Sequence, residues 1–193
     1  MKRFETFILV LILQSYLFSV VLNVPADYVY IQSAIDVSNN GDSILVQQGI
    51  YYENINYNGK SITILSTFYQ DTSNIQIIEN TIINGNDEGS CIVFENGEVA
   101  SSIIDGFTLS NGDGYLADPD GNGSFYTYGG GIYLKDSNPT LKNLIIKNNT
   151  GNIGGGGGLF AYNSSPNLSN ITFENNFSDD VGGAIYARQG SNL

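Results

Sequence analysis

The sequence predicts an all-β protein whose chain winds as a parallel β-helix. Three observations support this fold class. A repeat of about 27 residues runs through the last third of the chain, which is typical of stacked structural units. Short β-type runs are separated by Gly, Asn and Asp turns. No long amphipathic helix lies between those runs, which argues against alternating strands and helices.

The repeat is seen when residues 130–149 are laid over residues 157–176, and a third copy opens at Gly183. Each full copy starts with two glycines and ends in the pattern Leu-x-x-apolar-x-apolar-x-x-Asn. An earlier segment, Ile104-x-x-Phe107-x-Leu109, carries the same apolar spacing. Parallel strands stack about 4.8 Å apart, so equal positions should form ladders, aliphatic inside and asparagine at the turn.

The same spacing also occurs in leucine-rich repeats, which is the alternative fold. A leucine-rich repeat would follow its asparagine with a leucine-bearing helix or 3₁₀ segment. Here the glycines of residues 154–158 and a further β-type run at residues 158–162 follow instead. More than one strand per repeat favours the β-helix.

The elements are expected in a simple order. A short helix over residues 27–40, with Ile31, Ala34, Ile35 and Ser38 at helical spacing, should cap the N-terminal end. Strands are expected at residues 43–46, 61–65, 81–83 and 91–94. The predicted organisation is a signal peptide at 1–23 and a β-helix domain at 24–193, with cap and first coils at 24–66, irregular coils at 67–129 including a loop insertion at 111–129, and incomplete regular repeats at 130–193.

The N-terminal segment resembles a secretory signal. Lys2 and Arg3 precede an apolar run from Phe7 to Leu22. An uncleaved membrane anchor is the alternative, because no clean small-x-small cleavage site follows. At the other end Leu193 falls a few residues into a coil, so we expect a chain truncated at its C-terminus, with its terminal cap missing.

Composition excludes several functions. The net charge is −12 and only 7 residues are Lys or Arg, which excludes nucleic acid as a partner. The chain contains no histidine, so Ser-His and Cys-His catalysis and the usual zinc sites are excluded. Cys91 is the single cysteine and cannot form an intramolecular disulfide.

Two family resemblances follow from particular residues. Tyr30–Asp36, followed by Gly41–Val46 and Gly49–Ile55, resembles the N-terminal coils of right-handed parallel β-helices of the pectin-lyase-like superfamily. Phe173–Asn176 with Gly182–Ile185 is similar to the FxxN and GGA-[ILV] signatures of polymorphic outer membrane protein repeats. The second resemblance implies a secreted, surface-displayed β-helix. The earlier copy at residues 130–132 departs from it by lacking the alanine.

Carbohydrate-active members of the superfamily suggest an enzymatic alternative. A polysaccharide lyase needs a base and cations to hold a uronate, and few basic residues are present. A glycosidase could use Asp179 and Asp180 with Asp105 or Asp113. The further motifs that surround the paired aspartates in the polygalacturonases they resemble are absent, and Asp179 and Asp180 stand where an ordinary turn precedes Gly182, which is the favoured explanation.

The insertion at 111–129 resembles the start of a calcium loop. Asp118, Asp120 and Asn122 stand at alternate positions before Gly123, and Asp113 could add a further oxygen. The glutamate that would complete such a loop is replaced by a glycine. The sequence therefore offers calcium as the one candidate cofactor, with a solvated Asp-Gly loop as the alternative.

An aromatic residue follows the inward aliphatic residue in each repeat: Tyr133, Phe160 and Tyr186. Alternation turns these side chains outward. An aligned aromatic row on an exposed sheet predicts a platform for sugar rings. The alternative is that the rings stack on one another or are covered by a neighbouring chain.

These patterns predict a secreted or cell-surface protein, in the outer membrane by resemblance, that is non-catalytic and adhesin-like or glycan-binding. Its partners would be glycans or host-surface components, and membrane association would come only from the N-terminal signal or from segments beyond residue 193. Two alternatives remain: a polysaccharide-active enzyme (lyase, hydrolase or esterase) whose catalytic residues lie mostly outside this chain, and a structural self-association unit.

Overall fold

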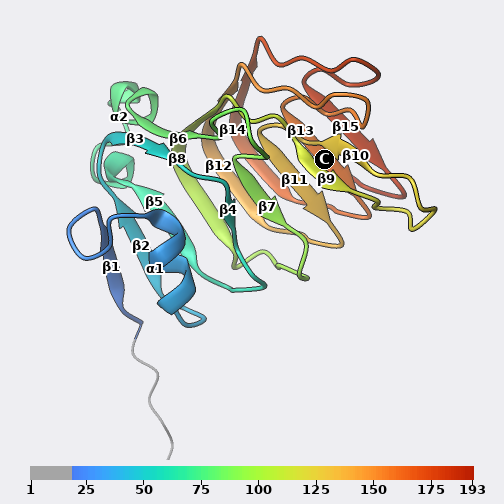
Figure 1. Cartoon of the computed structure of the whole chain (residues 1–193). Helices are drawn as coiled ribbons and strands as arrows, with labels where there is room; N and C mark the ends of the chain where they lie inside the picture. The colour runs from blue at the N-terminus through green and yellow to red at the C-terminus, as the bar shows by residue number, and fades with distance from the viewer. Residues whose placement is uncertain (1–18) are drawn as a thin grey trace, which may run out of the picture.

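The computed structural model describes residues 19–193, which form two parallel sheets facing one another (Figure 1). The larger sheet contains β1 (Val21–Val24), β2 (Ser43–Val46), β3 (Gly49–Tyr52), β5 (Thr63–Ser66), β6 (Thr81–Asn84), β8 (Ile103–Ser110), β12 (Thr140–Lys147) and β14 (Asn167–Glu174). The smaller contains β4 (Ile55–Asn56), β7 (Ile92–Phe94), β11 (Ile132–Lys135), β13 (Leu159–Tyr162) and β15 (Ile185–Arg188). From β7 to β15 the chain alternates between these sheets, apart from one inserted hairpin.

The predicted apolar pattern sets the register of the larger sheet. Leu141 pairs with Ile104 and Leu168, and Leu144 pairs with Phe107 and Ile171. The aliphatic ladder is therefore confirmed. At the following turn Asn149 donates its side-chain amide to Asn176 Oδ1 at 3.1 Å, which confirms the asparagine ladder. Strand β13 follows that turn where a leucine-rich repeat would place a helix.

The apolar core lies between the two sheets. Its inward side chains in β8 and β12, Ile104, Phe107, Leu141 and Leu144, are at most 1% exposed. Burial of such aliphatic surface is the main stabilising term of the fold. The chain is thus strand-rich and all its sheet pairings except the hairpin are parallel, as the sequence predicts.

Helix α1 (Ile31–Val37) covers the N-terminal end of this core, where the sequence predicts a capping helix. Its buried residues are Ile31, Ala34 and Ile35, and the buried Ser38 hydroxyl donates to the Ile35 carbonyl at 2.7 Å. Glu53 accepts from the N–H groups of the first turn, and Lys60 Nζ donates to carbonyls of the last turn, including that of Ser38 at 2.9 Å. Both helix ends are therefore satisfied by side chains from later loops, Glu53 after β3 and Lys60 before β5.

Two other segments bear on the N-terminal predictions. Residues 21–23, the end of the predicted signal peptide, belong to strand β1. This strand pairs with β2, and its Val24 is fully buried. Residues 1–18 of the predicted signal lie outside the described part of the chain. Within residues 19–193 no helix is both long and apolar enough to cross a membrane.

Two insertions lie against the outer faces of the sheets. A 3₁₀ helix, η1 (Thr67–Gln70), and a short helix, α2 (Ile75–Glu79), lie between β5 and β6 and flank the larger sheet. An antiparallel hairpin of β9 (Tyr115–Ala117) and β10 (Tyr126–Tyr128) lies over the smaller sheet. The sequence marks residues 67–79 only as irregular, so α2 is an element that it does not predict.

Candidate ligand-binding groove and aromatic column

The three predicted aromatics form a column on the outer face of the smaller sheet. Tyr133 pairs in register with Phe160, and Phe160 pairs with Tyr186. The rings of Tyr133 and Phe160 stack, with centroids 5.6 Å apart and planes inclined by 15°. The rings of Phe160 and Tyr186 are tilted by 56°, with centroids 5.7 Å apart. These rings belong to an apolar cluster separate from the core between the sheets, as their predicted outward direction requires.

The predicted exposed platform, however, is wrong for Tyr133 and Phe160, which are both 0% exposed. The β9–β10 hairpin covers them. The ring of Tyr115 lies 5.0 Å from that of Tyr133, and the ring of Tyr128 lies 4.4 Å from that of Phe160. Burial, and then the charge of Glu95, raises the pKa of Tyr133. A sugar cannot reach Tyr133 or Phe160 beneath the hairpin, whereas Tyr186 is partly exposed and a ligand contact there stays a prediction.

Polar contacts hold the hairpin over this column. The Tyr115 hydroxyl donates to Glu95 Oε1 at 2.9 Å, and Asn152 donates its side-chain amide to Asp113 Oδ1 at 3.2 Å. Arg188 of β15 lies 3.7 Å from Asp120 in a partly exposed ion pair. An exposed pair of this kind contributes little to stability, so the two hydrogen bonds and the aromatic contacts, rather than the ion pair, hold the hairpin in place.

The predicted calcium ligands are engaged in other contacts. Asp118 accepts hydrogen bonds from the N–H groups of Asn122 at 3.1 Å and Gly123 at 2.7 Å, and Asn122 Oδ1 accepts from Ser124 N at 2.8 Å. Asp113 accepts a hydrogen bond from Asn152, and Asp120 is paired with Arg188. Each of the four predicted calcium ligands therefore already contacts another group of the protein. Residues 19–193 contain no cluster of three or more His, Cys, Asp or Glu side chains that would hold a metal. Calcium binding by Asp113, Asp118, Asp120 and Asn122 stays a prediction.

The carboxylates considered for catalysis lie in different places. Asp105 is on β8 and accepts a hydrogen bond from the side chain of Asn143 at 2.6 Å. Asp179 and Asp180 are in the loop between β14 and β15, where the Asp180 N–H donates to the hydroxyl of Ser178 at 3.2 Å. The second arrangement is that of a local turn.

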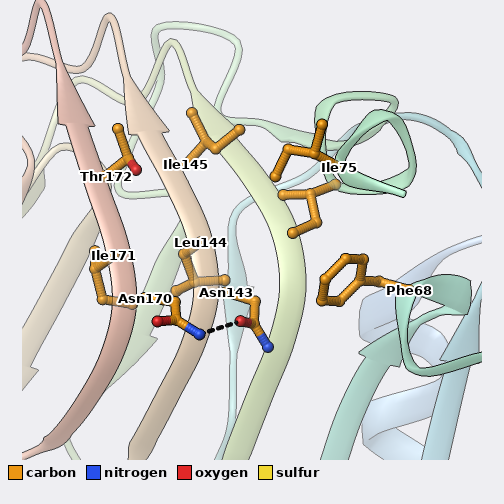
Figure 2. Close-up of a pocket in the computed structure, with 9 residues that line it drawn as sticks. Phe68, Ile75, Asn143, Leu144, Ile145, Asn170, Ile171 and Thr172 are labelled. Carbon is orange, nitrogen blue, oxygen red and sulfur yellow. Dashed lines mark hydrogen bonds between the residues drawn. The ribbon is translucent and has the colours of Figure 1, made fainter. Parts of the chain in front are cut away.

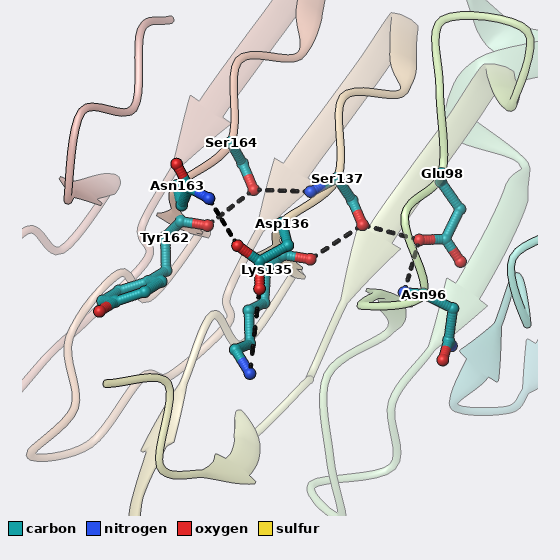
Figure 3. Close-up of polar contacts among 8 residues, drawn as sticks. All are labelled: Asn96, Glu98, Lys135, Asp136, Ser137, Tyr162, Asn163 and Ser164. Atoms are coloured by element: carbon teal, nitrogen blue, oxygen red, sulfur yellow. Dashed lines mark hydrogen bonds and ion pairs between the residues drawn. The ribbon is translucent and has the colours of Figure 1, made fainter. Parts of the chain in front are cut away.

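A second polar ladder with the repeat period runs along the edge of the fold (Figure 3). The Ser137 N–H donates to Ser164 Oγ, and the Ser164 N–H donates to Ser191 Oγ, both at 3.1 Å. At its start Ser137 Oγ donates to Glu98 at 2.8 Å. Glu98 is 1% exposed and also accepts the N–H groups of Gly59 and Asn96, so the buried carboxylate is fully engaged in structural contacts.

The outer face of the larger sheet carries an open groove of about 430 Å³ (Figure 2). One wall comes from η1 and α2, and the floor comes from consecutive positions of β12 and β14. The lining residues are Phe68, Ile75, Ile78, Asn143, Leu144, Ile145, Asn170, Ile171 and Thr172. Its volume lies in the range of about 300–1,000 Å³ that is usual for small-ligand sites.

The wall of the groove is fixed to the sheet by packing and hydrogen bonds. Phe68, Ile77 and Ile78 form a buried cluster against which Ile145 packs. The Thr108 hydroxyl donates to the Ile78 carbonyl at 2.9 Å, which ties α2 to β8. Ile75 stays 50% exposed at the rim.

The floor of the groove is a ladder of side-chain amides. Asn170 donates its side-chain amide to Asn143 Oδ1 at 2.9 Å, and Asn143 donates in turn to Asp105. Both asparagines have positive φ, 50° and 54°, a conformation that asparagine tolerates well. The equivalent position in β8 is Gly106, whose Cβ would lie 2.3 Å from Ser66 Oγ.

Sequence reasoning did not find this groove. The residues of its floor were available from the repeat, because Asn143 and Asn170 recur at the same position of two copies. The wall was not, since nothing in residues 67–79 indicates which strands α2 will lie against. The apolar residues Ile75, Ile77 and Ile78 are the only local signal for a packed segment there.

Comparison with known proteins gives one short match. Residues 170–188 match the Chlamydia polymorphic membrane protein (Chlamydia_PMP) repeat. The match begins within β14 and ends with β15, so it covers a strand of each sheet. No curated protein and no solved structure shows significant similarity to the chain.

Proposed function

We propose that this chain is a surface-exposed, non-catalytic adhesion protein built as a right-handed parallel β-helix of the pectin-lyase-like kind. The observation that carries the proposal is the position of the repeat match. Residues 170–188 coincide with the unit that places one strand in each parallel sheet, and the same unit recurs in register at the preceding repeat. Polymorphic membrane proteins are associated with the bacterial outer membrane or cell surface, and we infer the same location here.

An adhesive role is supported by the outer faces of the stack. A solenoid presents long rows of equivalent side chains, which suit extended partners. One such row lines the open groove beside α2, on a rigid sheet whose strands are paired on both sides at β12. We assign glycans or other cell-surface components as partners on this basis.

A non-catalytic role is supported by the contacts of the acidic side chains. Asp105, Asp113 and Glu98 each accept hydrogen bonds from neighbouring side chains. A glycosidase requires two carboxyl groups that face each other about 5–9.5 Å apart, whereas Asp105 lies on β8 and Asp179 and Asp180 lie in the loop between β14 and β15. The proposal therefore assigns these acids to the structure of the stack.

Surface labelling of intact producing cells tests the location. Antibodies raised against the purified protein should stain cells without permeabilisation, and mild external protease should remove that staining. A periplasmic or cytoplasmic protein of the same cells serves as control and should stain only after permeabilisation. Staining of this chain only in permeabilised cells would contradict a surface role.

Adhesion is tested separately with beads coated with the purified protein. Coated beads should bind to cultured cells more than beads coated with an unrelated acidic protein of similar size. Binding equal to that control would contradict the adhesive function while leaving the surface location intact.

A further inference from the structure

From the geometry of the groove beside α2 we infer that it binds a neutral, linear oligosaccharide running across the strands. This inference rests on the proposed adhesive function and assigns its ligand class and its site. It also moves the predicted glycan contact from the aromatic column of the smaller sheet to the outer face of the larger one. Figure 2 shows Phe68 and Ile75 on one side of the groove and Asn170, Ile171 and Thr172 of β14 on the other.

The floor of the groove offers hydrogen-bonding groups suited to hydroxyls. Within residues 19–193 neither Asn170 Oδ1 nor the Thr172 hydroxyl has a hydrogen-bond partner, and both residues are exposed. An amide oxygen accepts from a sugar hydroxyl, and a threonine hydroxyl can both donate and accept. The Asn170 amide is held by its bond to Asn143, so its acceptor is preorganised.

The wall supplies the apolar surface that the C–H faces of a sugar ring require. Ile75 is half exposed, and Ile145 lies between it and Thr172 along the groove. Because one side is aliphatic and the floor is amide and hydroxyl, the groove matches a ligand with one apolar and one polar edge. Pyranose rings have this character.

The repeat of the site fits a ligand that is itself a repeat. Asn143 and Asn170 are one strand apart, as are Ile145 and Thr172. Neighbouring strands are spaced about 4.8 Å, which is close to the length that one pyranose unit adds to a linear chain. A linear oligosaccharide can therefore present successive rings to successive strands.

Charge favours a neutral ligand. None of the nine lining residues is charged, and the whole chain carries −12. On the strands beside the lining, Lys142 pairs in register with Asp105, and Lys147 pairs with Glu174, so each lysine has an acid at the paired position of a neighbouring strand. A uronate chain would meet no cation in the lining of the groove, and the acidic surface would repel it.

A peptide partner is less favoured by the same geometry. Peptides that add to a sheet bind at a strand edge through free backbone groups. The groove lies on the face of the sheet, and β12 is already paired with both β8 and β14. Only side chains are available there, and these offer few donors for a peptide backbone.

The test is titration calorimetry of the purified protein with neutral linear oligosaccharides of hexose and of N-acetylhexosamine units, with oligogalacturonate as the acidic comparison. We expect at least one neutral series to bind, with affinity rising with chain length. Asn170→Gly removes the amide while keeping the positive φ, and should weaken binding roughly three- to tenfold, as loss of one or two hydrogen bonds predicts. Thr172→Lys, at an exposed strand position, should weaken it by blocking the groove.

Asn163→Gly is the matched control. Asn163 is also exposed, has a φ of 47°, and donates its amide to the preceding repeat, at Asp136, but lies outside the groove. It should bind like the unaltered protein. If no neutral oligosaccharide binds, if oligogalacturonate binds better, or if Asn163→Gly loses as much affinity as both groove variants, the inference is overturned.

Three further outcomes separate a contact between copies, an adhesive function elsewhere on the protein, and the proposed glycan site. Dimerisation of the unaltered protein that is abolished by Thr172→Lys would make the groove a contact between copies and overturn the inference. If beads coated with either groove variant adhere as well as beads coated with the unaltered protein, the adhesive function stands but does not depend on the groove. Loss of both bead adhesion and oligosaccharide binding in these variants, with Asn163→Gly unaffected, would support the two together.

Discussion

Each of the two sheets carries an outward row of side chains at equivalent positions of successive repeats. One insertion lies over each row, and the two insertions cover their rows to different extents. On the smaller sheet the β9–β10 hairpin covers Tyr133 and Phe160 completely. On the larger sheet α2 covers only part of the row: Thr108 is fully buried, Ile145 is partly buried and Thr172 is exposed. The repeat thus decides which side chains point outward, and the insertions decide which of them a ligand can reach.

The largest expected difference between the two rows is in stability. Phe160→Ala empties a fully buried site between the rings of Tyr133 and Tyr128. It should lower the free energy of unfolding by about 3–5 kcal/mol, as removal of buried aromatics does. Ile145→Ala, at the equivalent but partly open row, should cost about 1–2 kcal/mol because less surface is buried.

Urea denaturation followed by far-UV circular dichroism measures both variants. Because stacked repeats can unfold in parts, the midpoints should be compared at several wavelengths and in the aromatic region. Equal losses for the two variants would contradict the distinction between a covered row and an open one.

The sequence predicts the register of the strands and the outward direction of their side chains, but not which outward side chains an insertion covers. The register of β8, β12 and β14 was predicted residue by residue, because inward aliphatics at fixed spacing leave one pairing that buries them all. The outward direction of Tyr133 and Phe160 was predicted for the same reason. Their burial was not, since it depends on a hairpin whose place over β11 and β13 follows from tertiary packing of its rings, which the repeat pattern does not encode.

The wall of the groove shows the same limit. Helix α2 has only five residues, too few for a reliable helical period. Its position comes from Ile77 and Ile78 packing with Phe68 and from the Thr108 hydrogen bond to a backbone carbonyl. Neither contact has a spacing signature in the sequence.

A second prediction concerns a substitution in the β9–β10 hairpin that leaves the aromatic column beneath it unchanged. Tyr128→Ala removes the ring that lies 4.4 Å from Phe160 and leaves the column intact. We expect a loss of about 2 kcal/mol, smaller than for Phe160→Ala because the hairpin can shift to fill part of the space. Near-UV circular dichroism should fall and tyrosine quenching by acrylamide should rise, as Tyr133 becomes accessible. Unchanged quenching would mean that the hairpin does not shield the column.

A third prediction concerns the open row. Ile75→Ser alters a side chain that is half exposed at the rim of the groove. Its effect on the free energy of unfolding should stay within about 0.5 kcal/mol, as for most surface substitutions. Thermal unfolding measures this. A loss as large as that of Tyr128→Ala would show that α2 seals its row as fully as the hairpin does.

The smallest expected effect is a dependence of the cover on pH. Partial burial raises the pKa of Asp118, but hydrogen bonds led by that of the Gly123 N–H outweigh it, so the pKa lies below the ordinary value. A carboxyl with a lowered pKa in the folded state adds stability above its unfolded pKa. That stability is lost as the pH falls through the folded value.

Acidification should therefore loosen the loop that closes the hairpin before it affects the groove. Acrylamide quenching of tyrosine, recorded from about pH 6 to about pH 2, should rise in the unaltered protein toward the level of Asp118→Asn. The Asp118→Asn variant should show the raised level already at neutral pH, because an amide oxygen accepts the two N–H groups less strongly than a carboxylate. The difference between the two curves reports the contribution of the Asp118 carboxylate. A difference that persists unchanged at the lowest pH would show that the Asp118 carboxylate does not hold the hairpin closed.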